Sequence, residues 1–344
     1  MSQDKQKRTP LATLGEFGLI DHITKDFKNT NQETILGVGD DAAIMDYKDQ
    51  IVVTTDLLTE GIHFDLVYTP LKHLGYKCVA VNVSDIYAMN ATPKQITVSV
   101  ALSSRFGVED VEELYAGIKL ACDYYNVDLV GGDTTSSLTG MTISVTAIGT
   151  AKADKIVKRS GAKKNNLICV TGDLGAAYLG LQILEREKAV YDKDINEQPQ
   201  LSEYQYLLQR QLRPDARKDI IEELEKANII PSSMMDISDG LSSELKHICK
   251  QSGVGCHIYM DKLPIKQDTM AAANEMNIDP VIAALNGGED YELLFTVNID
   301  EYDKVIAIEG VSVIGNIVED VNQQYIITPQ NQSIELKAQG WVAM

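Results

Sequence analysis

The sequence has few features of secreted or membrane proteins. It contains five cysteines, an odd number, and no C-x-x-C, a pattern that predicts reduced, mostly buried thiols in a cytoplasmic protein. Residues 1–10 form no apolar signal segment, and no apolar run approaches the roughly 18 residues that a membrane-spanning helix needs. We therefore expect a cytoplasmic location and no membrane partner.

Positive charge is also scarce. The 344 residues include 31 Lys and Arg against 50 Asp and Glu, which gives a formal net charge of −19. This balance argues against nucleic acid as a partner, because a nucleic-acid backbone repels an acidic surface. The excess carboxylates could serve solubility, or some of them could bind metal ions. Their positions in the chain have to decide between the two.

Several motifs of nucleotide-binding and hydrolytic enzymes are missing. The sequence has no G-x-x-x-x-G-K-[ST], no paired H-R-D and D-F-G, and no G-x-S-x-G, which argues against a P-loop enzyme, a protein kinase and a serine hydrolase. Residues 37–42, GVGDDA, match the dinucleotide pattern G-x-G-x-x-A. Two aspartates there would repel a pyrophosphate unless metal ions intervened, so a Rossmann site is disfavoured.

Hydrophobic periodicity predicts a mixed α/β (α+β) fold with two domains. In the first domain we expect helices over 13–27, 71–91 and 108–125, and strands over 35–45, 51–57, 96–102, 127–130 and 141–150. A polar, basic stretch at 153–166 is typical of a linker, and 188–202 of a surface insertion. Between and after them we expect strands at 167–171 and 234–237, and helices at 176–187, 204–212, 215–227 and 241–251. The predicted domains are residues 1–152 and 153–344.

Carboxylates recur beside glycines and after apolar runs. This occurs in six segments: GVGDDAA at 37–43, TTD at 54–56, NVSD at 82–85, GGDTT at 131–135, DISDG at 236–240 and GGEDY at 287–291. One such segment is usually only a turn. Six of them predict loops that converge, and a cluster of carboxylates cannot stay ionised without cations. Histidine and cysteine do not accompany these acids, which favours Mg²⁺ over zinc. Carboxylates, Mg²⁺ and glycine loops together indicate phosphoryl transfer from a nucleotide.

These segments, in this order, resemble those of thiamine-monophosphate kinases. The resemblance runs from about residue 14 to residue 344 and includes AVNVSDIYAMNATP, LVGGDTTSS, MMDISDGLSSEL and NGGEDYELLFT. It implies a two-domain fold like that of aminoimidazole ribonucleotide synthetase, with an N-terminal domain that binds ATP and Mg²⁺ and pairs with its copy in a homodimer. The C-terminal α/β domain would bind the substrate.

The resemblance also implies roles for single residues. The metal ligands would be Asp41, Thr54, Thr55, Asp56, Asp85, Asp133, Asp236 and Asp239. Four of these, Asp41, Asp85, Asp133 and Asp236, would anchor the Mg²⁺ ions used in catalysis. ATP would contact Tyr115, Gly132, Asp133, Arg159 and Ser238. The substrate would contact His63, Glu289 and Trp341. His63 could instead be a hydrogen-bonded structural residue, Arg159 a salt-bridge partner and Trp341 a packing residue.

The implied reaction is phosphorylation of thiamine monophosphate by ATP, giving thiamine diphosphate. A related ATP-using enzyme, of the aminoimidazole ribonucleotide synthetase or selenophosphate synthetase type, is one alternative. Selenophosphate synthetase is disfavoured because no cysteine precedes Cys78. A non-catalytic nucleotide-binding protein is the other alternative, and the full set of predicted metal carboxylates argues against it.

Overall fold

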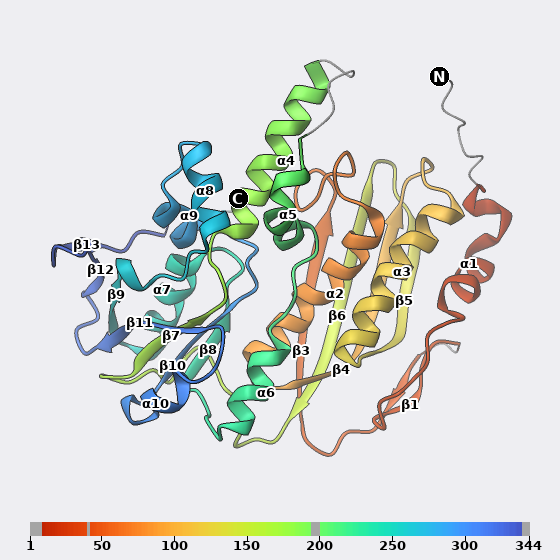
Figure 1. Cartoon of the computed structure of the whole chain (residues 1–344). Helices are drawn as coiled ribbons and strands as arrows, with labels where there is room; N and C mark the ends of the chain where they lie inside the picture. The colour runs from red at the N-terminus through yellow and green to blue at the C-terminus, as the bar shows by residue number, and fades with distance from the viewer. Residues whose placement is uncertain (1–8, 40–41, 194–199, 339–344) are drawn as a thin grey trace. The chain divides into compact units, whose positions relative to one another are not determined.

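The computed structural model describes residues 9–39, 42–193 and 200–338. The chain divides into two compact units: residues 1–86 with 92–151, and residues 87–91 with 152–344. Figure 1 shows both, coloured along the chain. None of the helices in the described part is long and apolar enough to span a bilayer. All five cysteines are buried and unpaired, as the sequence predicts.

The first unit is built on a four-stranded sheet with the order β3-β6-β4-β5. Only β4 and β5 run parallel, and the other two pairs are antiparallel. A two-stranded hairpin, β1-β2, precedes this sheet. The elements of the first unit are η1 (Leu11–Thr13), α1 (Gly15–Thr24), β1 (Thr34–Leu36), β2 (Ile44–Met45), β3 (Gln50–Thr59), α2 (Leu71–Ala88), β4 (Thr92–Leu102), α3 (Val108–Tyr125), β5 (Asp128–Ser136) and β6 (Met141–Ala151).

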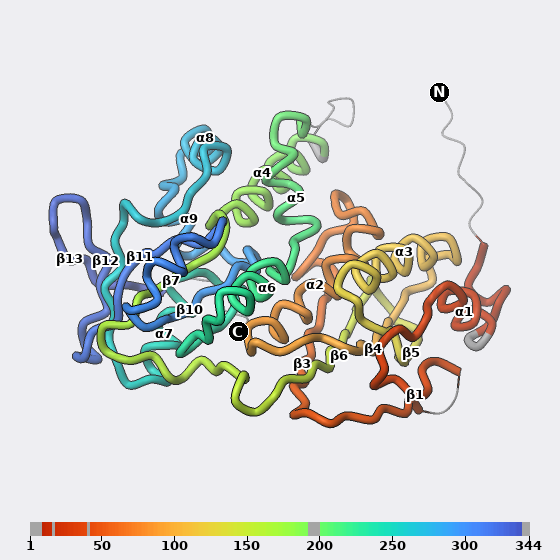
Figure 2. The backbone as a smooth tube through the Cα atoms, turned by 60° about the horizontal axis from the view of Figure 1, so that its bottom comes forward, coloured from red at the N-terminus to blue at the C-terminus, as the bar shows by residue number. Residues whose placement is uncertain are grey.

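Helices α2 and α3 lie along one face of the four-stranded sheet (Figures 1 and 2). Along β4 and β6 buried residues alternate with partly exposed ones, which is the pattern of strands with one covered face. The two helices approach each other closely at two glycines. A Cβ atom on Gly75 would lie 1.9 Å from the Leu114 carbonyl oxygen, and one on Gly117 would lie 1.9 Å from the Lys72 carbonyl oxygen. No other residue could occupy these positions without moving the helices apart.

The second unit is built on a seven-stranded sheet with the order β13-β12-β9-β11-β7-β10-β8. All of its pairs are antiparallel except β12 with β9. Its strands are β7 (Leu167–Thr171), β8 (Ser233–Asp236), β9 (Gly255–Tyr259), β10 (Leu293–Val297), β11 (Val311–Val318), β12 (Gln324–Ile327) and β13 (Ser333–Glu335). Its helices are α4 (Ala176–Lys193), η2 (Ser202–Tyr204), α5 (Gln205–Leu212), α6 (Lys218–Lys226), α7 (Leu241–Ser252), η3 (Met260–Lys262), α8 (Gln267–Glu275), α9 (Pro280–Asn286), η4 (Ile299–Glu301) and α10 (Tyr302–Val305).

The centre of this sheet is buried on both faces. Along β7, Ile168 and Val170 belong to the apolar cluster that contains Leu241 and Leu245 of α7. Leu167 and Cys169 belong to a different cluster, which contains Leu224 of α6. The continuous apolar run of β7 therefore has a physical cause, because each side of the strand contacts its own core.

Three sequence predictions need correction. The stretch predicted as one strand at 35–45 contains parts of two short strands, β1 and β2, which pair with each other, and the glycine-rich segment lies between them in the sequence. The strand predicted at 127–130 extends to Ser136 as β5, because its pairing with β4 continues. The predicted insertion at 188–202 begins as helix, since α4 runs on to Lys193.

A buried carboxylate, Asp128, anchors the segment before β1. It accepts hydrogen bonds from the Thr30 amide (2.7 Å), the Asn31 amide (3.1 Å) and the Thr34 hydroxyl (2.6 Å). Burial alone would raise the pKa of Asp128, but these hydrogen bonds to the ionised form outweigh it and lower the pKa. The chain is thus fixed shortly before it enters the glycine-rich segment at 37–43.

Asp128→Asn is expected to lower the free energy of unfolding by about 1–3 kcal/mol near neutral pH, because a charged acceptor of several hydrogen bonds is lost. A depressed carboxyl pKa stabilises the fold above the unfolded-state value and loses that effect as pH falls through the folded-state value. The difference between the two proteins should therefore shrink below about pH 4. Urea titrations at several pH values measure this difference. A gap that is constant or widens in acid would contradict the assignment.

Candidate active site

In the first unit, β3 and α2 bring two of the predicted metal-binding carboxylates together. The Thr54 hydroxyl donates a hydrogen bond to Asp85 Oδ2 at 2.5 Å. Asn82, one turn before Asp85 on α2, accepts the Asp56 amide N–H through Oδ1 at 3.1 Å. The Asn82 side-chain amide donates in turn to the Cys78 carbonyl at 2.9 Å. The strand and the helix are therefore held in register at the position of the two acids.

Asp56 and Asp85 repel each other. The pKa of Asp56 is raised to about 6, first by burial and then by the negative charge of Asp85. Such a pair favours either a shared proton or a bound cation. The surrounding donors are carboxylate and hydroxyl oxygens, which are the ligands that hard divalent cations prefer.

Asp133 lies on the other face of the sheet. It pairs with Ser99 of β4, which pairs with Ser144 of β6, which pairs with Leu57 of β3. Residues opposite one another on neighbouring strands share a face, and Leu57 follows Asp56 directly. Thr55 also lies on this second face, where its hydroxyl donates to the Val145 carbonyl at 3.0 Å.

The expectation that the acids lie in loops is wrong for this unit. Asp56 and Asp133 lie within strands, and Asp85 lies within a helix. Gly132 lies within β5, and a Cβ atom there would be only 1.9 Å from the Val98 carbonyl oxygen. The lack of a side chain at Gly132 therefore allows β5 to approach β4 closely. Across the described ranges, three or more His, Cys, Asp or Glu side chains nowhere form a group that could hold a metal ion. Asp41 lies outside the described residues.

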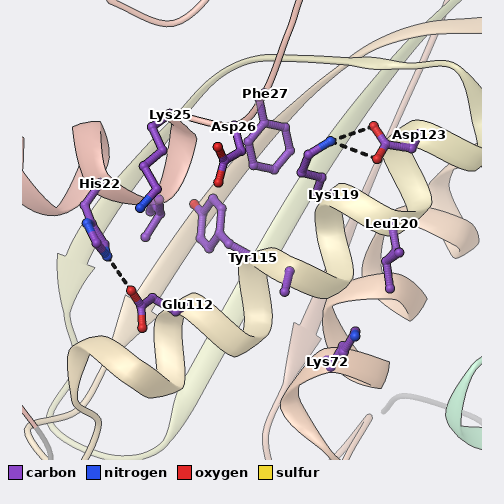
Figure 3. A pocket seen from close by; sticks show the side chains of 12 residues that line it. His22, Lys25, Asp26, Phe27, Lys72, Glu112, Tyr115, Lys119, Leu120 and Asp123 are labelled. Carbon is purple, nitrogen blue, oxygen red and sulfur yellow. Dashed lines mark hydrogen bonds and ion pairs between the residues drawn. The ribbon is translucent and has the colours of Figure 1, made fainter.

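Tyr115 borders a cavity of about 400 Å³ between α1 and α3. Figure 3 shows Tyr115 and Phe27 facing each other there, with ring centroids 6.4 Å apart in an edge-to-face arrangement. The Lys119 ammonium lies 5.9 Å from the centre of the Phe27 ring. Burial raises the pKa of Tyr115, so its phenol stays neutral. The cavity combines an aromatic wall with charged groups at its rim.

His63 has a structural contact. The Thr59 amide donates to His63 Nδ1 at 3.0 Å, across the turn that follows β3. This bond fixes the ring against its own turn. The bond is consistent with the alternative that His63 is a hydrogen-bonded structural residue. A contact with the substrate would have to use the other atoms of the ring.

In the second unit, two loops that carry predicted site residues lie against each other. The Glu289 amide donates to the Ser238 carbonyl at 2.7 Å, and the Tyr291 amide donates to the Ile237 carbonyl at 2.9 Å. Gly288 permits this contact, since a Cβ there would lie 2.6 Å from the Ser238 carbonyl oxygen. Glu289 and Tyr291 have φ values of +66° and +51°, which are strained for residues other than glycine.

Charged groups gather around Asp239 in this unit. Burial raises the pKa of Asp239; His247 and Arg159 oppose the rise, and Glu289 adds to it. The Asp239 amide donates to Glu244 Oε1 of α7 at 2.8 Å. Burial raises the pKa of Glu244 to about 7. The structure thus places the predicted residues Arg159, Asp239 and Glu289 in one neighbourhood.

Asp236 is buried at the end of β8, opposite Leu293 of β10, and Ser238 follows in the loop. Asn82, Gln211 and Glu244 were missed by the sequence reasoning. Asn82 stands three residues before Asp85, so its position on the same helix face was a usable signal. Gln211 had no such signal, because it is far from every acidic segment in the sequence.

Comparison with known proteins agrees with the motifs. Residues 39–151 match the family model described as "AIR synthase related protein, N-terminal domain", and residues 163–327 match the corresponding C-terminal domain. The thiamine-monophosphate kinase of Aquifex aeolicus is 37% identical over 319 residues, which cover 90% of this chain and 97% of that protein. The chain belongs to the thiamine-monophosphate kinase family.

Solved structures of thiamine-monophosphate kinases share the fold. One, described as AaThiL complexed with AMPPCP and TMP, is 33% identical, with a TM-score of 0.75 and coverage of 98% of this chain and 100% of that one. The enzyme from Stenotrophomonas maltophilia is 31% identical, with a TM-score of 0.78 and coverage of 93% and 98%. The fold and the family predicted from the motifs are confirmed, and the predicted class of enzyme is that of these relatives. The roles of the individual site residues remain predictions.

Proposed function

We propose that the protein transfers the γ-phosphoryl group of ATP to the phosphate of thiamine monophosphate, giving ADP and thiamine diphosphate. The observation that carries this proposal is the Asp56–Asp85 carboxylate pair, held by Thr54 and Asn82 in a chain of this family. The relative described as complexed with AMPPCP and TMP supports it, because AMPPCP is an analogue of ATP.

The chemistry needs no general base. The acceptor phosphate is largely dianionic near neutral pH, since the second pKa of a phosphate monoester is about 6. One of its oxygens forms the new P–O bond as the bond between the γ-phosphorus and the β,γ-bridging oxygen breaks, and ADP leaves. The protein's task is to hold two anions in line and to stabilise the charge between them.

The donor set suits Mg²⁺. Asp56 and Asp85 offer two carboxylates whose mutual repulsion a cation would relieve, and no histidine or cysteine belongs to the predicted ligand set. We propose that the ligands are shared among several Mg²⁺ ions, because Thr55 and Asp133 lie on the opposite face of the sheet from Asp56. The proposed ligands are Asp41, Thr54, Thr55, Asp56, Asp85, Asp133, Asp236 and Asp239. When bound, Mg²⁺ would neutralise phosphate charge. Thr54 and Asn82 hold the two acids ready for it.

The remaining roles follow the same proposal. Tyr115, Gly132, Arg159 and Ser238 would contact ATP, and His63 and Glu289 would contact the acceptor. Trp341, also proposed for the acceptor, lies outside the described residues. A homodimer is supported by two exposed apolar side chains on one face of β3, Val53 and Leu57, which are 61% and 55% exposed in the part of the chain that the structure describes. A cytoplasmic location stays a prediction from the sequence.

An acceptor assay tests the function. With ATP and Mg²⁺, we expect thiamine diphosphate and ADP in equal amounts when thiamine monophosphate is present. We expect neither product with unphosphorylated thiamine, and none after a chelator removes the metal. Phosphorus NMR identifies the new diphosphate. ATP turnover that is the same with and without thiamine monophosphate would refute the proposal, and binding of ATP with no turnover would favour the non-catalytic alternative.

A further inference from the structure

Helix α5 contacts the loop that carries Glu289. Gln211 is 5% exposed, and its side-chain amide donates to Glu289 Oε2 at 2.7 Å. The carboxylate of Glu289 is therefore oriented by a neutral side chain from a different part of the sequence. Because the partner is charged, this is one of the stronger kinds of side-chain hydrogen bond.

The preceding residue of the same helix holds the main chain of this loop. Arg210 Nη2 donates to the Asp290 carbonyl at 2.9 Å and lies 2.9 Å from Glu292 Oε1. On the other side, the Asp290 carboxylate accepts the Gly175 amide at 2.7 Å, just before α4. The strained backbone at Glu289 and Tyr291 is thus held from two directions, as a conformation of this cost requires.

The direction of the Glu289 carboxylate matters because of its neighbours. The Glu289 amide donates to the Ser238 carbonyl at 2.7 Å, which places Glu289 beside Asp239 on the adjoining loop, where the two negative charges repel each other. The bond from Gln211 fixes Glu289 against that repulsion. The acceptor proposed above carries a cationic heterocycle, and a carboxylate held in a fixed direction attracts a cation better than one that must first be ordered.

We propose that Gln211 is a positioning residue for acceptor binding, which it supports by orienting Glu289. This inference rests on the proposed function. Arg210 contributes by fixing the main chain of the loop, but its removal would also unbalance buried charges. Gln211 is neutral, so its replacement tests the positioning role more cleanly.

The test is a double-mutant cycle with Gln211→Ala, Glu289→Ala and the combined variant. Gln211→Ala is expected to raise the KM for thiamine monophosphate about tenfold, the usual cost of a hydrogen bond to a charged group, and to leave the KM for ATP within about twofold. In the Glu289→Ala background the same change should have no further effect, because the carboxylate that it orients is gone. Gln209→Ala is the matched control, since Gln209 lies exposed on the same helix and should behave like the wild type.

Gln211→Glu keeps the shape of the side chain but opposes one carboxylate to another, and it should raise the KM for thiamine monophosphate at least as much as Gln211→Ala. If Gln211→Ala does not fold, which a thermal melting curve would show, Gln211→Glu still tests the positioning role. An unchanged KM in either folded variant, or an equal effect with and without Glu289, would overturn the positioning role. A wild-type protein that does not phosphorylate thiamine monophosphate at all would overturn the proposed function instead, and this inference with it.

Discussion

Asp85→Ala is expected to abolish phosphoryl transfer while the protein still folds. Asp85 of α2 lies near Asp56 of β3, and the pKa of Asp56 is raised first by burial and then by the charge of Asp85. Removing it deletes a predicted metal ligand, and we expect kcat to fall by at least about 10²–10³-fold, as for other losses of transition-state charge stabilisation. Steady-state assays with thiamine monophosphate measure this loss.

The fold should tolerate the change because Asp85 is repelled by its neighbour. Without it, the pKa of Asp56 should move back toward its ordinary value, and the melting temperature should stay unchanged or rise slightly. Asp85→Asn retains an acceptor for the Thr54 hydroxyl but removes the charge, so it should be nearly as inactive. Asp303→Ala, an exposed aspartate of α10, is the control and should keep full activity. Full activity in Asp85→Ala would exclude Asp85 from the catalytic site.

The second large effect is expected from Arg210→Met, on stability. Burial alone would lower the pKa of Arg210, but the charges of Glu292 and Asp290 outweigh it and raise the pKa. Asp290 and Glu292 are 0% and 1% exposed, and Arg217 also contacts Glu292, at 2.5 Å. Removing one member of a buried ionic group leaves the opposite charge uncompensated, and we expect a loss of about 3–5 kcal/mol in the free energy of unfolding.

Urea denaturation of the variant and the wild type measures that loss. Burial raises the pKa of Asp290 to about 7 and Arg210 opposes the rise, so the variant should raise it further. Below its folded-state pKa of about 7, Asp290 is protonated in both folded proteins, so its contribution to the difference between them is lost. The difference between variant and wild type should therefore narrow as pH falls toward about 5.

Arg186→Met provides a matched control, because Arg186 also contacts two carboxylates, Glu187 and Glu275, but near the surface. Exposed pairs of this kind contribute at most about 1 kcal/mol. If both replacements cost the same small amount, the buried network around Glu292 would not be a major source of stability.

Sequence patterns predicted the elements better than their contacts. The apolar runs of β7 and β8 and the periodicity of α2 and α3 identified these elements, because both patterns report directly on burial. The end of β5 was misplaced because GGDTTS has the composition of a turn. Its strand conformation depends on β4, which supplies a pairing edge that composition does not reveal.

The candidate site shows the same limit. Motif order identified the family and the acids, and the structure brings Asp85 to Asp56 and Asp239 to Glu289. Which face of the sheet Asp133 occupies depends on strand register, and a shift of one residue reverses it. The role of Gln211 depends on how α5 packs against the loop that carries Glu289, which lies 78 residues further along the chain. No local sequence pattern predicts such a contact.

The glycine contacts between α2 and α3 have a mechanical consequence. The two backbones are in direct contact at Gly75 and Gly117. Because no flexible side chain separates the helices there, α2 and α3 form a rigid pair. Tyr115 lies on α3 and Asp85 lies on α2. The distance between the proposed nucleotide contact at Tyr115 and the proposed metal ligand at Asp85 is therefore fixed. Any adjustment to ligands of different length would have to come from other parts of the molecule.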